Sequence, residues 1–283
     1  MRYRERPVGA PLDVFVECVW FLSTSCGEGL ESREQTILPD GCIEAIFHLG
    51  ERFLGRQEAA AIFRSQPTAF VAGMLTRPLR VDAVAGADSV GIRFRPGGAS
   101  AFFDGPLAQL TDRVTPLDDL WGDAARELES RLHESAADAD RAAFVESALR
   151  ARLRRANTER RIDAAVHDLI RSAGCMSIAR VASRAGVTTR HLQRRFTASV
   201  GVGPKTLARI LRFQNTLRVR ANGGDGDWLR VAIDCGYTDQ SHLIHDYAAF
   251  AGDTPAGLLA AESELSAYFT APQRLAALFG ARR

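Results

Sequence analysis

The 283-residue sequence lacks the features of several protein classes. No apolar run reaches the roughly 18 residues of a membrane-spanning helix, which excludes an integral helical membrane protein. The five cysteines form no C-x-x-C pair and are odd in number, so we expect buried free thiols rather than disulfides or a zinc knuckle. They are Cys18, Cys26, Cys42, Cys175 and Cys235. No G-x-S-x-G motif, P-loop or G-x-G-x-x-G following a strand is present.

Histidine is also scarce in the first half of the chain, where only His48 and His133 occur. Cys42 and His48 lie six residues apart and share one face of a predicted strand, but two ligands do not make a metal site. We therefore expect no metal, no cofactor and no catalytic residue.

Lysine is nearly absent, since Lys205 is the only one, but the charge is unevenly distributed. Residues 1–150 hold 16 basic and 23 acidic side chains, a net of −7, and residues 151–283 hold 20 and 11, a net of +9. The 56 residues 169–224 contain 11 basic side chains and no carboxylate. This asymmetry predicts a polyanionic partner for the second half. It also suggests a hypothesis in which the acidic half partly masks the basic half until an effector binds.

Three arginines in the first six residues precede an apolar stretch at 14–22, as in a signal peptide. Asp13 and Glu17 interrupt the stretch and no small-residue cleavage site follows, so we interpret it as a strand. We expect a cytoplasmic protein.

The first half has the pattern of an antiparallel β-domain, a small barrel or a sandwich. Residues 14–16, 19–22 and 70–72 are β-branched and aromatic runs of strand length, and residues 42–49 alternate with a period of two. Turn chemistry ends such runs at 39–41 and 95–98. Thr115 is the predicted N-cap and Pro116 the first residue of a helix reaching about His133, and a second helix is predicted from Asp138 to Arg155.

The second half reads as helices and contains an internal repeat. Eight positions agree at an offset of about 50 residues. The second copy has one extra residue, which lies between Gly236 and Leu243. The first copy is Val181, Ala182, Gly186, Val187, Leu192, Phe196, Gly201 and Pro204, and the second is Val231, Ala232, Gly236, Tyr237, Leu243, Tyr247, Gly252 and Pro255.

Each copy has the pattern of a helix-turn-helix. Gly186 stands where the chain leaves a short amphipathic helix, and glycine adopts positive φ there at little cost. Thr188 or Thr189 caps the next helix, which buries Leu192 and Phe196. In the second copy the predicted cap is Thr238 or Asp239. A helix at about 204–219 joins the copies, the glycine-rich segment 222–227 breaks it, and the tail 262–283 looks helical.

Residues 231–243 (VAIDCGYTDQSHL) and 250–255 (FAGDTP), with 200–205 (VGVGPK), resemble the DNA-binding domain of the AraC/XylS family of bacterial transcription regulators. Residues 37–49 (ILPDGCIEAIFHL) are similar to an uncharacterised N-terminal domain that accompanies it in some members. Such N-terminal domains are often cupin-like sensors. The resemblance implies an α+β chain of two domains, a β-rich sensor or dimerisation domain at 1–155 and an all-α DNA-binding domain at 156–283.

The resemblance also implies that two recognition helices enter successive major-groove segments of double-stranded DNA. Base contacts then fall on Arg190, Gln193, Arg194, Gln240, Ser241, His242 and His245. An arginine is common in the family where His245 stands, and Asp246 adds a carboxylate there, so we expect the second unit to read fewer bases. Phosphate contacts are predicted for Arg184, Arg195, Lys205, Arg209 and Arg212.

Several alternatives stay open. The alternative to base contact is that the exposed residues of either unit form a solvated helix face. For Arg195 the alternative to phosphate contact is an ion pair with an acidic residue of the N-terminal domain. Trp20, Phe47 and Phe94 are candidates for an effector pocket, against a plain role in the core. The expected partners are DNA, a small-molecule effector, RNA polymerase and a second copy of the chain, with no membrane. The competing hypotheses are an enzyme tethered to DNA and a partner-binding module with a degenerate DNA domain. The sequence predicts neither the operator nor the effector, and it does not predict whether the protein activates or represses transcription.

Overall fold

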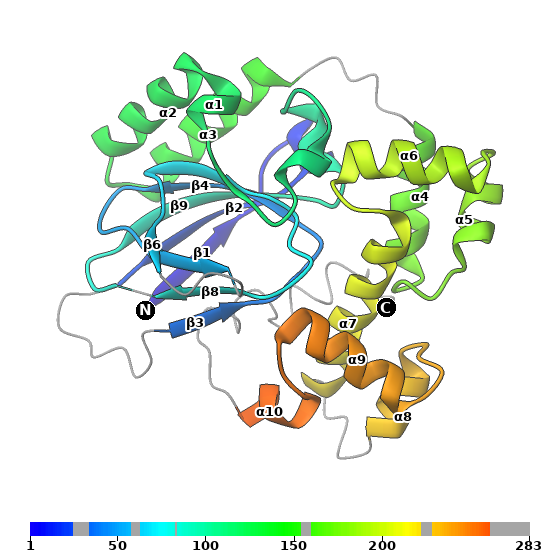
Figure 1. Cartoon of the computed structure of the whole chain (residues 1–283). Helices are drawn as coiled ribbons and strands as arrows, with labels where there is room; N and C mark the ends of the chain where they lie inside the picture. Colours follow the sequence, from blue (N-terminus) through cyan, green and yellow to red (C-terminus); the bar gives the residue numbers. More distant parts are fainter. Residues whose placement is uncertain (25–33, 58–62, 83, 154–159, 222–227, 261–283) are drawn as a thin grey trace.

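The N-terminal part of the structure, a computed structural model (Figure 1), is a sandwich of two antiparallel sheets. The structure describes residues 1–24, 34–57, 63–82, 84–153, 160–221 and 228–260. The six-stranded sheet has the order β1 (Arg2–Arg6), β2 (Val16–Ser23), β9 (Asp88–Phe94), β4 (Ile43–His48), β7 (Ala69–Ala72) and β10 (Val114–Pro116). The four-stranded sheet has the order β3 (Glu34–Ile37), β8 (Leu79–Asp82), β5 (Leu54–Gln57) and β6 (Arg64–Ser65). The predicted sandwich is therefore confirmed, and these strands form no closed barrel.

Both faces of the six-stranded sheet are covered. Along β4, Ile43, Ala45 and Phe47 join the main hydrophobic core, whereas Glu44 and His48 face the second sheet. The stretch predicted as a strand from residue 14 begins only at residue 16, because a 3-10 turn, η1 (Leu12–Val14), precedes it.

Three helices cover the outer face of the six-stranded sheet (Figure 1): α1 (Asp118–Trp121), α2 (Asp123–Glu134) and α3 (Asp138–Arg152). The prediction of one helix capped by Thr115 was wrong. Thr115 and Pro116 pair with β7 as strand β10, so the helix starts later. It is then divided at Gly122, whose φ of +58° cannot continue a right-handed helix.

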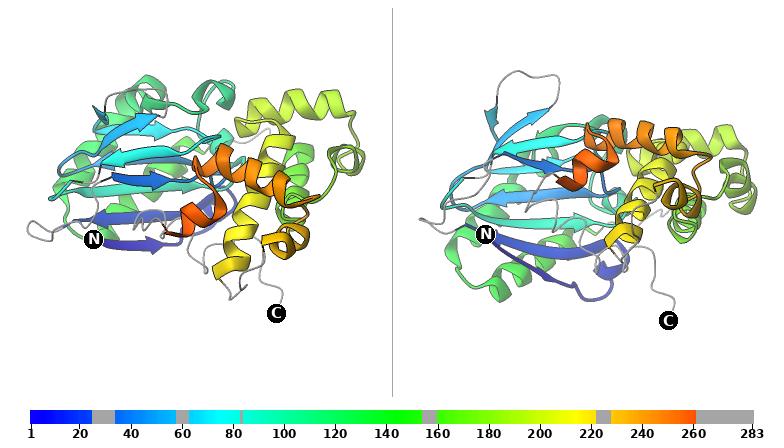
Figure 2. Two further views of the ribbon diagram at one scale, coloured as in Figure 1. Left: turned by 60° about the horizontal axis from the view of Figure 1, so that its bottom comes forward. Right: turned by 90° about the horizontal axis from the view of Figure 1, so that it is seen from below.

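The C-terminal helices lie at one end of the sandwich in every view (Figure 2). They are α4 (Arg160–Arg171), α5 (Ile178–Arg184), α6 (Thr189–Val200), α7 (Pro204–Ala221), α8 (Trp228–Asp234), α9 (Gln240–Ala251) and α10 (Pro255–Ala260). The repeat is confirmed, because a seven-residue helix precedes a twelve-residue helix in both copies. The predicted break at 222–227, the tail 262–283 and Cys26 lie outside the described residues.

One hydrophobic core spans the sheet domain and the first helix-turn-helix unit. It joins Phe47 and Met74 of the sandwich to Leu192, Phe196 and Val200 of α6. Two 3-10 turns, η2 (Gly98–Ala101) and η3 (Leu107–Leu110), pack against α6. At the end of α6 the Thr111 hydroxyl donates to the Gly201 carbonyl at 2.7 Å. The first unit is therefore continuous with the sandwich.

The second unit has a core of its own. Ile210 and Phe213 of α7 pack there with Leu243 and Tyr247 of α9, and Leu38 joins from the sandwich. A buried hydrogen bond from Gln214 Nε2 to the Pro39 carbonyl, 2.6 Å long, lies beside Leu38.

Cys18, Cys42 and Cys235 are buried free thiols as predicted, but Cys175 is exposed. It lies in the turn after α4, where its Sγ donates to the Cys235 carbonyl at 3.5 Å. No described helix combines the length and apolarity that would let it cross a membrane.

Candidate nucleic-acid interface and sensor pocket

The first unit presents α6 with its polar face outward. Gly186 takes a φ of +66°, which turns the chain between α5 and α6, and the Thr188 hydroxyl accepts the backbone N–H of His191 at 3.2 Å. Of the two predicted caps, Thr188 is the one used. Leu192 and Phe196 are fully buried. Because these two side chains fix the rotation of α6, the predicted base-contacting residues are exposed on the opposite face: Arg190, Gln193 and Arg194.

The Gln193 side chain lies along its helix. Its Nε2 donates to the Thr197 hydroxyl at 3.4 Å, and a Cβ placed on Gly203 would come within 2.5 Å of that nitrogen. In this conformation the amide points toward the C-terminal end of α6, so a bidentate contact to adenine requires a rotamer change.

The second unit follows the same plan with a turn one residue longer. Asp239, rather than Thr238, caps α9 by accepting the His242 backbone N–H at 2.8 Å. Gln240, Ser241 and His245 are exposed, as predicted.

His242 is less available to DNA than the other predicted residues of the second unit. It is half-buried, its ring lies edge-on to Tyr237 at 5.1 Å, and its Nδ1 lies 3.2 Å from the Thr238 hydroxyl. The outer face of α9 also carries Ile244, which is 38% exposed and was not predicted. The signal was available, since Ile244 directly follows the buried Leu243.

Asp246 is not at the interface, contrary to the sequence-based prediction. Its side chain is 1% exposed and accepts two hydrogen bonds from Arg209 of α7, at 2.9 and 2.7 Å. Arg209 in turn lies over the Phe250 ring at 5.0 Å. The guanidinium predicted to contact phosphate is thus held inside the second unit, because a buried carboxylate requires a charged partner.

The other predicted phosphate-contacting residues differ in their surroundings. Lys205 and Arg195 are exposed, and Arg195 has further contacts within the protein. Arg184 pairs with Asp168 at 2.7 Å, and this hydrogen bond raises the pKa of its guanidinium. Arg212 lies over the Tyr237 ring at 5.3 Å. Lys205 is exposed in the first turn of α7.

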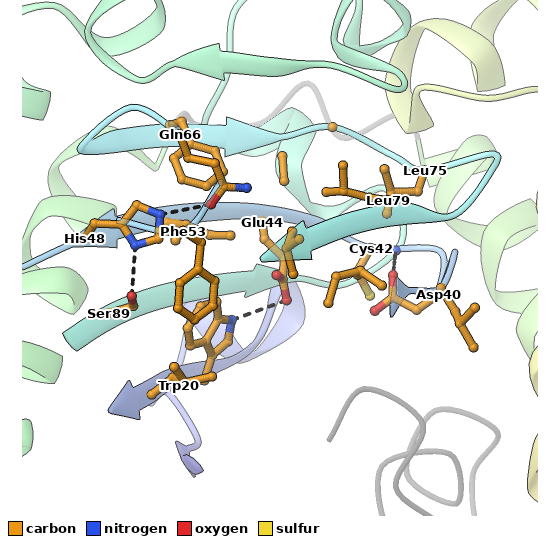
Figure 3. Close-up of a pocket in the computed structure, with 18 residues that line it drawn as sticks. Trp20, Asp40, Cys42, Glu44, His48, Phe53, Gln66, Leu75, Leu79 and Ser89 are labelled. Carbon is orange, nitrogen blue, oxygen red and sulfur yellow. Dashed lines mark hydrogen bonds between the residues drawn. The ribbon is translucent and has the colours of Figure 1, made fainter. Parts of the chain in front are cut away.

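A cavity of about 80 Å³ lies between the two sheets (Figure 3). Trp20 lines it from β2, Glu44 and His48 from β4, and Leu79 from β8. The ring of Trp20 fits because it packs over Gly91, where an added Cβ would lie 1.9 Å from the indole. Leu38, Asp40 and Cys42 of the loop 38–42 also line the cavity, and Figure 3 shows Asp40 and Cys42 at one end of it.

Of the three predicted effector-binding residues, only Trp20 lines this cavity. Phe47 and Phe94 are fully buried in the main core on the opposite face of the sheet. The alternation along β4 explains the error: Phe47 belongs to the set facing the helices, and its neighbours Ile46 and His48 face the cavity. On β4 the pocket-lining residues missed by the sequence are therefore the even-numbered ones, and the other missed residues come from β2, β3, β7, β8, β9 and the loops between strands.

His48 forms a hydrogen-bonded chain at one end of the cavity. Its Nδ1 lies 2.9 Å from the Ser89 hydroxyl and its Nε2 3.0 Å from Gln66 Oε1. Burial lowers the pKa of His48, and the bond to Gln66 offsets only part of this. The amide oxygen accepts the Nε2 proton, so the Ser89 hydroxyl donates to Nδ1 of a neutral ring.

Glu44 lies nearer the middle of the cavity and is bonded to two donors. The Trp20 Nε1 donates to its Oε1 at 3.3 Å, and the fully buried Arg93 donates to the same atom at 2.7 Å. Burial alone would lower the pKa of Arg93, but the neighbouring carboxylate of Glu44 keeps that pKa above its ordinary value. Within the described ranges no group of three His, Cys, Asp or Glu side chains is arranged to hold a metal ion.

Comparison with known proteins finds two families, each matching a separate part of the chain. Residues 4–116 match a family described as a domain of unknown function (DUF6597), and residues 181–261 match a helix-turn-helix domain. A comparison with curated proteins finds no match.

Among solved structures the chain is similar to ToxT from Vibrio cholerae, at 8% identity and a TM-score of 0.44, with 92% of this chain and 98% of that chain covered. A second structure, of wild-type ToxT bound to an unsaturated fatty acid, has 9% identity and a TM-score of 0.41, with coverages of 85% and 93%.

Proposed function

We infer the function from the C-terminal domain: residues 181–261 are an AraC-type helix-turn-helix domain, and the chain is a sequence-specific DNA-binding regulator of transcription. The observation that carries the proposal is the pair of capped helices, α6 and α9, whose outer faces expose side chains suited to base edges. Arginine pairs with guanine O6 and N7, glutamine with adenine N6 and N7, and Ile244 suits the thymine methyl group.

Selection of double-stranded DNA by the full chain from a random library tests this function. We expect a site with two half-sites spaced about one helical turn, roughly 10 base pairs. Arg190→Ala or Arg194→Ala is expected to lose preference at one base pair within the half-site read by α6. Recovery of sequences with no shared motif would contradict the proposal.

We propose that the cavity between the sheets senses a small-molecule effector and that the loop 38–42 transmits its occupancy. This loop has two contacts at once. Leu38, Asp40 and Cys42 line the cavity, while Leu38 also packs in the core of the second unit. A ligand that moves the loop therefore acts directly on the core formed by α7 and the second recognition helix, α9.

The bond between Gln214 and the Pro39 carbonyl offers a test of this coupling. Gln214→Leu removes the donor from a buried carbonyl and leaves every outward residue of α6 and α9 in place. We expect faster backbone hydrogen exchange in the loop 38–42 and in α9 together. The matched control is Gln109→Leu at an exposed glutamine. Faster exchange confined to α7 would contradict transmission through the loop.

RNA polymerase and a second copy of the chain are further proposed partners. Support comes from α8, where Leu229 is 46% and Ile233 60% exposed, a pair of apolar side chains on the surface of the second unit. Leu229→Ser with Ile233→Ser should weaken such a contact without weakening DNA binding. Light scattering and a polymerase-recruitment assay on the cognate promoter would measure it.

The enzyme alternative rests on one observation, the Ser89–His48–Gln66 chain beside a cavity. We favour a structural role, because each bond satisfies a polar group buried between the sheets. Hydrolysis of small aryl esters that disappears in Ser89→Ala would instead support an enzyme. A metal assay on the purified protein tests the metal-dependent form of the same alternative.

A further inference from the structure

A groove of about 630 Å³ lies between the end strands of the two sheets. Strand β10 ends the six-stranded sheet on this side of the sandwich, and β6 ends the four-stranded sheet. Residues of both strands line the groove, together with parts of β5 and β8. Gln66 and Leu79 line the groove and also the cavity between the sheets (Figure 3), so the groove lies directly outside the cavity.

The groove is basic, although the domain around it is acidic. Arg56 and Arg64 line it from the four-stranded sheet and Arg113 from the residue before β10, and its described lining includes no carboxylate. This reversal of charge is local, because residues 1–150 hold 16 basic and 23 acidic side chains, a net of −7. The lining of the groove thus has the charge of an anion site.

Two of the three arginines are available to a ligand. Arg56 pairs with Glu34 at 3.2 Å and lies over the Phe63 ring, so its guanidinium is already engaged. Arg64 and Arg113 are exposed, and no side chain in the described part of the chain forms an ion pair with either of them. Each guanidinium can bind a carboxylate through two parallel hydrogen bonds.

The backbone of β10 adds a hydrogen-bond donor at the edge of the sheet. The Arg113 carbonyl accepts the Gly73 N–H at 2.9 Å, and Thr115 pairs with Val71, so residues 113 and 115 direct their backbone groups to β7. Successive residues of a strand alternate in this respect, which directs the Val114 N–H to the opposite, outer edge. Val114 lines the groove, so a ligand anion there meets a backbone donor as well as the arginines.

The size of the groove and its remaining walls favour an organic ligand. Its volume falls within the range of about 300–1,000 Å³ that is common for small-molecule sites. Pro67, Leu79 and Pro116 contribute apolar surface. Because Arg64 belongs to one sheet and Arg113 adjoins the other, a ligand that engages both carries two separate anionic groups.

We propose that this groove binds an organic dicarboxylate, with one carboxylate on Arg64, the other on Arg113, and the apolar body between them. The proposal goes beyond the regulator function, since it depends on neither recognition helix. It gives the sandwich a second ligand site outside the enclosed cavity. The two sites share a wall, because Gln66 lines the groove while its side chain is bonded to His48 in the cavity.

Matched probes test the ligand class on the full chain by titration calorimetry at low ionic strength, where exposed charges are least screened. Isophthalate, 3-carbamoylbenzoate and isophthalamide share one ring and carry two, one and no negative charges. We expect each lost charge to weaken binding by at least about tenfold. Phenyl phosphate, which carries its charge on a single group, should bind more weakly than isophthalate because it cannot engage both arginines.

Substitution of the two arginines tests the site itself. Arg64→Gln and Arg113→Gln should each lower the affinity for isophthalate about tenfold. The double variant should bind isophthalate no more tightly than the wild type binds isophthalamide. Arg2→Gln is the control, because it removes the same charge from an exposed arginine of β1, at the opposite edge of the six-stranded sheet. It should bind as the wild type does.

The proposal is overturned if isophthalamide or phenyl phosphate binds as tightly as isophthalate, if the double variant keeps the wild-type affinity, or if isophthalate shows no binding at tens of millimolar. Near-ultraviolet circular dichroism verifies that the variants are folded. DNA selection is measured separately without dicarboxylate. A chain that binds isophthalate in the expected manner but selects no DNA sequence would refute the regulator function and leave the dicarboxylate site standing.

Discussion

The two helix-turn-helix units share a sequence pattern but are anchored differently. In the first, Leu192, Phe196 and Val200 belong to the same core as the sandwich, and Thr111 is bonded to the end of α6. In the second, the described core consists of residues of α7 to α10 with Leu38 as the contribution of the sandwich. The first unit is therefore packed as part of the sandwich, whereas the second contacts it through the loop that carries Leu38, which is the route proposed above for transmission.

The exposed chemistry of the units differs as well. The outer face of α6 carries arginines, which give long-range attraction to phosphates and discrimination of guanine. The outer face of α9 carries Gln240, Ser241, two histidines and Ile244 but no arginine, and the only carboxylate of the helix, Asp246, is buried. If the loop 38–42 transmits occupancy of the cavity as proposed, a first unit packed in the core of the sandwich and a second unit with its own core suit a regulator that binds one half-site constitutively and the other under control of a ligand.

The largest expected effect comes from Phe213→Ala, in the core of the second unit. Phe213 is fully buried, with Tyr247 edge-on at 5.0 Å. We expect a loss of about 3–5 kcal/mol of stability. Hydrogen exchange should rise in α8 and α9 and stay unchanged in α5, α6 and the sandwich. Phe196→Ala is the matched variant, and its exchange should rise in both α6 and the sandwich. An even rise across the chain in both variants would abolish the distinction between the units.

The next effect concerns the buried ion pair of the second unit. Asp246→Ala leaves Arg209 without its partner and should cost about 2–4 kcal/mol, below the upper range for such pairs because the Arg209 side chain is 28% exposed. Chemical denaturation followed by far-ultraviolet circular dichroism would measure it.

Arg209→Ala distinguishes two roles for that arginine. If Arg209 only holds Asp246, the substitution should weaken DNA binding by disturbing the second unit, and the salt dependence of binding should stay unchanged. If Arg209 contacts a phosphate, as predicted from the sequence, the magnitude of the slope of log affinity against log salt should instead fall by about 0.9.

A smaller effect separates the two recognition helices. Arg194→Ala should cost about 1–3 kcal/mol on the selected site and relax the preference at one base pair, whereas His245→Ala should cost less than about 1 kcal/mol. Gel-shift titrations on the selected site and on single-base variants give both values. Equal losses on selected and random DNA for Arg194→Ala would mean that the side chain contacts only phosphate.

Lys205→Ala should have an effect of similar or smaller size without sequence preference. As an exposed phosphate contact at the start of α7, it should lower affinity evenly on all sequences and reduce the salt slope by about 0.9. Lower affinity on the selected site alone would assign Lys205 to base reading.

The smallest expected effect is on the pH dependence of the sensor. Because burial lowers the pKa of His48 below 6.5, the unfolded chain binds a proton below that pH before the folded chain does. The free energy of unfolding keeps its full value above pH 6.5 and decreases as the pH falls toward the lowered pKa of His48. His48→Gln should flatten this loss, and His133→Gln, at an exposed histidine, should not. Exchange at acidic pH should rise in the sandwich and α6 before it rises in α9.

The features predicted from the sequence are those set by neighbouring residues. Gly186, Thr188 and the spacing of Leu192 and Phe196 define a capped helix locally, so the first unit and its exposed face followed from the pattern. Asp246 did not, because its partner Arg209 lies 37 residues away and only the packing of α9 on α7 brings them together. Likewise, alternation revealed two faces of β4, but only the placement of the helices shows that Phe47 belongs to the face away from the cavity.

The shared core has a consequence for modularity. The change from one hydrophobic cluster to the other occurs inside α7, where Leu207 and Leu211 pack with the sandwich while Ile210 and Phe213 pack with the second unit. A chimaera that joined this sensor to a foreign reader ahead of α4 would separate the sandwich from the residues that complete its interior. The fusion junction of such a chimaera should instead lie within α7, so that the sensor and the first unit are transferred together.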